Sequence, residues 1–156
     1  MRILVVEDRG AVLYPLEDAL RSLGHELLTA FGVAQARDVW NSEKDNVDCI
    51  IVDLNIPADA RAKEAIDEKN RISHNKEWHE LAGWIWLEQE GFVQKKTSLA
   101  KGAPTVIIYS GYLDVWQKLG CRDSDYPSVK CFRKGPGAAT NLLEYIRMIA
   151  AKQERP

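Results

Sequence analysis

The strongest constraint on the fold is a regular alternation of short apolar runs with segments of helical periodicity. Three of the runs are continuous and rich in Val and Ile, as expected of strands buried on both faces. They cover 3–6, 48–53 and 104–109, and weaker strand patterns cover 25–30 and 128–132. The segments between the runs repeat apolar residues at helical spacing. They predict helices over 11–23, 32–41, 81–90, 113–119 and 138–152.

Strands that alternate with helices predict an α/β fold in which helices cover both faces of a parallel sheet. Right-handed crossovers leave few topologies for such a doubly wound sheet. The flavodoxin-like five-stranded order 2-1-3-4-5 is a common one for a chain of 156 residues. This length fits one domain, so we assign residues 1–156 to a single domain.

A polar stretch at about 58–80 does not fit a minimal version of this fold. It is rich in Ala, Glu, Lys and Arg, and it stands where such folds need only a short loop. We interpret it as an insertion, part of which forms an exposed helix. Trp78, Trp84 and Trp86 are expected to pack this insertion against the rest of the domain.

The composition excludes several classes of protein. The formal net charge is −2, from 21 basic and 23 acidic residues, so we expect no direct nucleic-acid binding. No apolar run approaches the roughly 20 residues that a membrane span needs, and the first residues lack the features of a signal peptide. Three cysteines are too few for a disulfide framework. We therefore expect a cytoplasmic protein without a membrane partner, and Cys49 is expected in the core.

Polar residues stand at the ends of four of the predicted strands. Glu7 and Asp8 follow the first strand, and Asp53 closes the third. Ser110 follows the fourth strand and Lys134 the fifth. Ligands of open parallel sheets bind beyond the carboxyl ends of the strands, at the point where the strand order reverses. We therefore expect these five side chains to converge on one edge of the sheet.

This grouping suits phosphoryl transfer onto a carboxylate. Clustered carboxylates repel each other unless a hard cation such as Mg²⁺ neutralises them with oxygen ligands. One aspartate can act as the nucleophile, and a lysine ammonium can attract the phosphoryl oxygens. Simpler interpretations remain open at this point. Asp53 could cap a turn, Ser110 could cap a helix, and Lys130 or Arg133 could replace Lys134.

Four motifs together resemble the receiver domains of two-component response regulators. MRILVVED resembles the first strand with its acidic pair, and VDCIIVDLNIP resembles the strand that carries the phosphoacceptor. PTVIIYSGY resembles the strand that ends in a hydroxyl, and VKCFRKGPG resembles the last strand with its lysine. The resemblance covers nearly the whole chain outside the 58–80 stretch.

The resemblance implies a role for each site residue. Asp53 would be the phosphoacceptor, and Ser110 and Lys134 would contact the phosphoryl group. The metal ligands would be Glu7, Asp8, Asp53 and the backbone carbonyl of Asn55, which bind Mg²⁺. The phosphoryl group would come from a histidine kinase or a phosphotransfer protein, and the output would pass to a downstream protein by direct contact. The chain ends at Pro156, so no effector domain is expected after the last helix unless the chain is a fragment.

Two rival functions remain. The first is a pseudo-receiver, in which the same fold serves as an interaction module without phosphorylation. The second is a metal-dependent phosphohydrolase that forms an aspartyl phosphate. Such enzymes typically need a second aspartate two residues after the nucleophile, and this chain has Asn55 there. We therefore do not expect it to be an enzyme that turns over a separate substrate.

The chain also departs from the receiver pattern. Glu7 replaces the first aspartate of the acidic pair, and Gly135 separates Lys134 from the following proline. Cys131 stands where receivers often carry an aromatic switch residue. Phe132 is adjacent, but alternation along the strand predicts that it points to the opposite face. Phosphoryl chemistry at Asp53 is therefore better supported than the usual aromatic switch.

Overall fold

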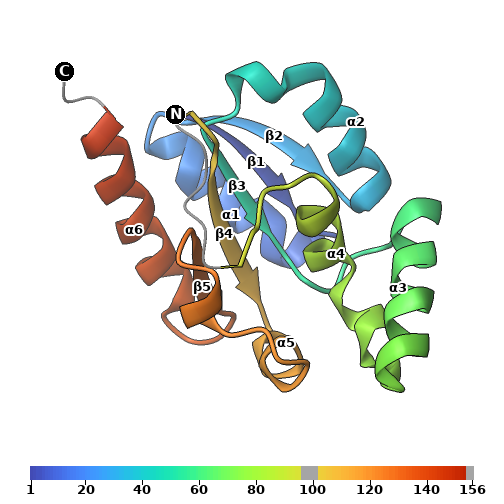
Figure 1. The fold of residues 1–156 in the computed structure, drawn as a ribbon. Coiled ribbons are helices and arrows are strands. Elements are labelled where there is room, and N and C mark those ends of the chain that lie inside the picture. The colour runs from blue at the N-terminus through green and yellow to red at the C-terminus, as the bar shows by residue number, and fades with distance from the viewer. Residues whose placement is uncertain (96–101, 154–156) are drawn as a thin grey trace.

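The computed structural model describes residues 1–95 and 102–153, and within them helices and strands alternate as the sequence predicts (Figure 1). The strands are β1 (Arg2–Val6), β2 (Glu26–Ala30), β3 (Cys49–Val52), β4 (Thr105–Ser110) and β5 (Val129–Arg133). The α-helices are α1 (Gly10–Ser22), α2 (Val33–Glu43), α3 (Ala60–Ser73), α4 (Ala82–Gln89), α5 (Leu113–Lys118) and α6 (Ala138–Gln153). Short 3₁₀ helices are η1 (Lys44–Asn46), η2 (Lys76–Leu81) and η3 (Asp123–Asp125).

The strands form one five-stranded sheet in the order β2-β1-β3-β4-β5, and all four pairings are parallel. This order confirms the predicted topology. The register pairs Val6 of β1 with Val52 of β3, and Val52 with Ile108 of β4. The carboxyl ends of β1 and β3 are therefore level, and the strand order reverses between them.

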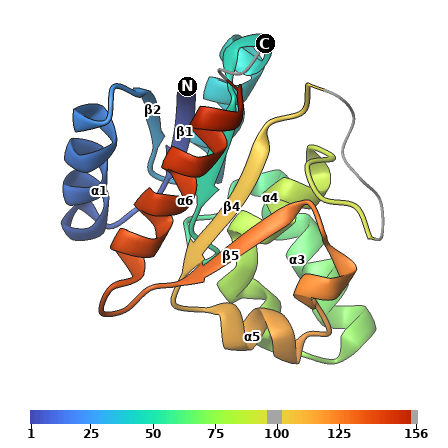
Figure 2. The ribbon, with the colours of Figure 1, turned by 90° about the vertical axis from the view of Figure 1, so that its left-hand side faces the viewer.

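Helices cover both faces of the sheet (Figure 2). Alternate strand residues enter two separate hydrophobic cores, so that Ile3 and Val5 of β1 lie on one face and Leu4 and Val6 on the other. The first core is completed by α1 and α6. The second is completed by α2, α4 and α5. This two-sided burial explains why the strands of the sequence are continuous apolar runs.

The polar stretch at about 58–80 forms α3 and η2, which confirms that part of it is helical. In Figure 1, α4 lies between the sheet and α3. Because α4 is enclosed on both sides, its residues from Ala82 to Leu87 are all buried. Trp78, Trp84 and Trp86 are buried in the same core, as expected. The interpretation of 58–80 as an insertion stays a prediction.

The ends of three strands differ by one residue from the sequence prediction, and β5 ends at Arg133 rather than at 132. Ser110 was expected to follow the fourth strand, but it is the last residue of β4. It pairs with Arg133 of β5, and its carbonyl accepts a hydrogen bond of 3.1 Å from the Lys134 N–H, which extends the ladder by one residue. Asp53 was expected inside the third strand, but β3 ends at Val52. The Asp53 N–H still donates to the Val6 carbonyl at 2.9 Å, so Asp53 remains tied to the sheet.

Two further observations concern membrane-spanning helices and the cysteines. Within residues 1–95 and 102–153, no helix is both long enough and apolar enough to cross a membrane. Cys49 is buried in the core, as predicted, and all three cysteines are unpaired. Burial raises the pKa of Cys121 and of Cys131 to about 12, so neither thiol ionises readily near neutral pH.

Candidate functional site: an acidic pocket at the sheet edge

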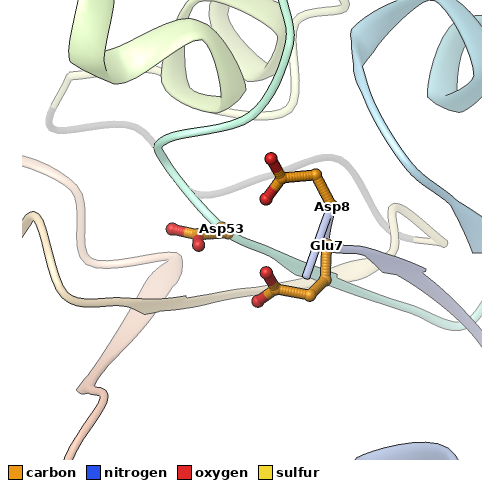
Figure 3. A group of neighbouring side chains, drawn as sticks. All are labelled: Glu7, Asp8 and Asp53. Carbon is orange, nitrogen blue, oxygen red and sulfur yellow. The ribbon is translucent and has the colours of Figure 1, made fainter. Parts of the chain in front are cut away.

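Three carboxylates meet where β1 and β3 end (Figure 3). Glu7 and Asp8 follow β1, and Asp53 follows β3. One oxygen from each of the three lies within 4.8 Å of the others. Glu7 and Asp53 are each only 3% exposed, whereas Asp8 lies at the surface. Two buried carboxylates at this distance repel each other, so the site requires positive charge to be stable.

Asp53 receives hydrogen bonds from three directions. The Ser110 hydroxyl donates to Asp53 Oδ1 at 2.5 Å, and the Asn55 N–H donates to the same oxygen at 3.2 Å. The Lys134 ammonium donates to the other oxygen, Oδ2. Ser110 is completely buried, and its oxygen accepts from the Tyr112 N–H at 3.1 Å. The Asp53 carboxylate is therefore held in one orientation at the edge of the sheet.

Lys134 is the cation of this pocket. Its ammonium contacts both Glu7 Oε2 and Asp53 Oδ2, and its side chain is 14% exposed. The two alternatives from the sequence lie elsewhere. Arg133 pairs with Asp114 at the surface, and the Lys130 ammonium lies 5.9 Å from the centre of the Phe132 ring. Of these three basic residues, Lys134 is the one that contacts Glu7 and Asp53.

The protonation of Glu7 depends on two opposing effects. Burial raises the pKa of its carboxyl above the ordinary value, and the hydrogen bond from Lys134 opposes this rise. The Arg9 N–H also donates to Glu7 Oε1, at 3.1 Å. The pKa of Glu7 is therefore raised on balance, although its partners, and above all Lys134, favour the charged form.

The chemistry of these groups fits a hard divalent cation. Carboxylate and carbonyl oxygens are the ligands that Mg²⁺ prefers. Glu7, Asp8 and Asp53 offer carboxylate oxygens close together, and Asn55 is tied to Asp53 by its N–H. Exposure of Asp8 leaves one side of the group open to solvent, from which an ion could enter.

Two residues of the pocket's surroundings were not predicted from the sequence. The Asn55 side-chain amide donates to a carboxylate oxygen of Glu80, in η2. Gly83, in α4, approaches the backbone of the loop after β3 so closely that a Cβ atom there would lie 2.1 Å from the Asp53 carbonyl oxygen. A glycine inside an otherwise apolar helix was a usable signal of close backbone approach. No sequence signal connected Glu80 with Asn55, because that contact depends on the path of the 58–80 stretch.

Side chains of β5 point as alternation predicts. Cys131 packs against the core that contains α4 and α5, whereas Phe132 packs against the core that contains α1 and α6. The Phe132 ring lies 5.6 Å from the ring of Tyr145 in α6. An aromatic side chain at 132 therefore does not face α5, the helix that follows Ser110.

Comparison with known proteins supports the fold. No protein-family model matches the chain, and no curated protein matches it in sequence. Solved structures do match over nearly the full length. One is a response regulator receiver domain protein from Clostridium thermocellum, with 17% identity over 98% of this chain and 96% of that one, at a TM-score of 0.55.

Two further matches have similar statistics. The receiver domain of the hybrid histidine kinase CckA has 22% identity over 95% of this chain and 97% of its own, with a TM-score of 0.57. The signal receiver domain of an HD domain-containing protein from Pseudomonas fluorescens Pf-5 has 20% identity over 99% of this chain and 98% of its own, with a TM-score of 0.59. The fold defines a doubly wound α/β protein. More specifically, it is the CheY-like receiver fold, with an acidic cluster at the edge of the sheet.

Proposed function

We propose that the chain is a phosphoryl-accepting receiver domain of a two-component signalling system, with Asp53 as the acceptor. The donor would be the phosphohistidine of a histidine kinase or of a phosphotransfer protein. The output would pass to a downstream protein by direct contact. The observation that carries the proposal is the arrangement around Asp53, where Ser110 and Lys134 bind different oxygens of one buried carboxylate.

The proposed reaction is a displacement at phosphorus. A carboxylate oxygen of Asp53 attacks the phosphorus atom, and the bond from phosphorus to the imidazole nitrogen of the donor breaks. The bonding electron pair stays on that nitrogen, which takes up a proton when the neutral histidine forms. The product on this chain is an aspartyl phosphate.

The chain's own residues have distinct tasks in this reaction. Lys134 supplies a compact positive charge to a phosphoryl oxygen, and Ser110 supplies a hydroxyl donor. Glu7, Asp8, Asp53 and the Asn55 carbonyl would hold Mg²⁺. The ion would offset the negative charge on the phosphoryl oxygens during transfer. Burial of Asp53 strengthens each of these interactions, because water screens them little.

A direct test is incubation with acetyl phosphate or phosphoramidate in the presence of Mg²⁺. Intact mass spectrometry should detect a gain of one phosphoryl group on the wild-type protein. The gain should disappear in Asp53→Asn, which keeps the size of the side chain but removes the nucleophilic carboxylate. It should also disappear when EDTA removes the metal. A modification that survives in Asp53→Asn would contradict the assignment.

The same experiment separates the rivals. A folded protein that accepts no phosphoryl group from either donor or from a purified histidine kinase would be a pseudo-receiver. Continuous release of phosphate from small phosphate esters would indicate a phosphohydrolase instead. We do not expect such turnover, because the residue two positions after Asp53 is Asn55, whose amide cannot act as a general acid or base.

A further inference from the structure

Successive residues of the loop after β3, from Asp53 to Asn55, contact η2 and the start of α4. The Asn55 side-chain amide donates to Glu80 Oε2, in η2. The Gly83 N–H donates to the Leu54 carbonyl at 2.9 Å, and Gly83 itself lies against the Asp53 carbonyl. The loop that carries two of the proposed metal ligands is therefore held from outside by η2 and the start of α4.

Glu80 is fixed in its turn by neighbours in η2. Its second carboxylate oxygen, Oε1, lies 2.9 Å from His79 Nε2. The other nitrogen of that imidazole, Nδ1, contacts the Lys76 carbonyl. When the imidazole is protonated, both of its nitrogens donate, so that His79 holds one oxygen of Glu80 while Asn55 holds the other, and the two contacts limit rotation of the carboxylate.

The element that carries Glu80 is itself anchored on both sides. Trp78 of η2 is buried in the core, and its indole N–H donates to Ser73 Oγ at 3.2 Å, at the end of α3. Glu77 pairs with Lys118 of α5 at 2.6 Å. Glu80 therefore approaches Asn55 from a fixed support rather than from a free loop.

Asn55 is restrained at two points by these contacts. Its N–H donates to Asp53 Oδ1, and its side chain donates to Glu80. The first contact fixes the peptide plane before Asn55 and the second fixes its side chain, so together they limit the backbone rotation that sets the direction of its carbonyl. Groups that orient a metal ligand from outside change metal affinity by about 10–100-fold when they are removed.

We propose that Glu80 is a positioning residue for the metal site: it orients Asn55, and through Asn55 it sets the affinity of the pocket for Mg²⁺. This inference rests on the proposed function, because it assumes the Mg²⁺ site. It extends that function by giving the polar 58–80 stretch a defined task at the pocket. Glu80 does not touch the reacting atoms.

The test is calorimetric titration of the purified protein with Mg²⁺ alone, without any phosphodonor. Glu80→Ala should bind Mg²⁺ about 10-fold more weakly than the wild type. Glu80→Gln should restore most of the affinity, because its amide oxygen still accepts from Asn55. Glu68→Ala is the matched control, since it changes an exposed glutamate of the neighbouring helix α3 that pairs with Arg71, and it should bind Mg²⁺ like the wild type.

Each alternative outcome has a distinct meaning. Equal Mg²⁺ affinity of Glu80→Ala and the wild type would overturn the role of Glu80 and leave the proposed function intact. Equal weakening in Glu80→Ala and Glu80→Gln would also overturn it, because the effect would then follow charge rather than orientation. Absence of Mg²⁺ binding by the wild type would overturn both this inference and the metal site of the proposed function. Thermal unfolding without metal identifies any variant that does not fold. If Glu80→Ala does not fold, Asn55→Ala takes its place, and we expect the same weakening of Mg²⁺ binding, by about 10-fold.

Discussion

At the scale of single residues, Gly83 shows how closely the acidic pocket is packed from outside. The position of a Cβ atom at 83 would be 2.1 Å from the Asp53 carbonyl oxygen and 3.1 Å from the carbonyl carbon. Both are backbone atoms of the loop that carries the acceptor, so they cannot rotate away as a side chain can. Only glycine allows α4 to begin this close to the loop.

We therefore expect Gly83→Ala to destabilise the protein. Relieving the overlap requires a shift of α4 or of the acceptor loop, and such overpacking lowers the free energy of unfolding by about 1–3 kcal/mol. Urea unfolding monitored by circular dichroism measures the change. Gly135→Ala is the control, because a Cβ atom at 135 meets nothing within 4 Å. That variant should change stability by less than about 1 kcal/mol. Equal stability of the two variants would mean that the close approach at Gly83 is absent in solution.

At the scale of secondary structure, α3 is attached to the body of the domain through its first turn. Asp59 caps the helix, because its carboxylate accepts a hydrogen bond of 2.7 Å from the Ala62 N–H. The same carboxylate pairs with Arg37 of α2 at 2.9 Å, and Arg37 also contacts Glu90, just after α4. One aspartate thus joins α3 to a helix that covers the sheet.

Loss of this aspartate should loosen α3. We expect Asp59→Ala to lower the free energy of unfolding by about 1–2 kcal/mol, since it removes both the helix cap and the pairing with Arg37. Asp59→Asn should lose less, because asparagine is an equally good cap. Asp67→Ala, at an exposed position of the same helix, should change stability little. Chemical unfolding at neutral pH measures all three, and equal values for Asp59→Ala and Asp67→Ala would contradict the anchoring role.

The pairing also predicts a dependence on pH. Burial alone would raise the pKa of Asp59, but hydrogen bonds from Arg37 and from the Ala62 backbone outweigh it and hold the pKa below the ordinary value. The folded state therefore favours the charged form. The contribution of charged Asp59 to the free energy of unfolding is complete above the ordinary aspartate pKa of about 3.9. It is lost as the pH falls through the lower pKa that Asp59 has in the folded protein. The stability difference between the wild type and Asp59→Asn should accordingly shrink below about pH 4. A difference that stays constant across this range would exclude the linkage.

At the scale of the whole molecule, the proposed metal site joins the ends of two neighbouring strands that are distant in sequence, because Glu7 and Asp8 follow β1 and Asp53 follows β3. An ion that binds only the folded arrangement stabilises the entire domain. Mg²⁺ should therefore raise the melting temperature of the wild-type protein. Most of this increase should disappear in Asp8→Ala, whose exposed position makes the substitution itself mild.

The matched control for this experiment is Asp18→Ala, another exposed aspartate, which lies on α1 and outside the acidic cluster. It should keep the full increase with Mg²⁺. An identical increase in both variants would show that the ion acts elsewhere on the protein. Ca²⁺ in a parallel titration would report how strongly the pocket selects between the two ions.

Features that depend on local sequence patterns or on the sheet topology were predictable, whereas contacts that depend on how particular helices pack were not. The apolar runs and the glycines and polar residues that end them are local signals, so the order of elements and the sheet topology were predictable. The meeting of Glu7, Asp53, Ser110 and Lys134 was also predictable, because parallel strands place their carboxyl ends on one edge. The contact between Asn55 and Glu80 was not, since it depends on how α3 and η2 pack. The predicted ends of β3, β4 and β5 were also wrong by one residue, because the hydrogen bonds between strands decide where each strand ends.

The burial of α4 has a consequence for any shortened form of the protein. A helix that is apolar on every side requires cover on every side, and α3 supplies it on the side away from the sheet. Deleting 58–80 to obtain a minimal domain would expose apolar surface of α4, and the product would be expected to self-associate. A soluble minimal form would need polar replacements on the outer side of α4 at the same time. The 58–80 stretch and α4 therefore depend on each other, and a change to one requires a matching change to the other.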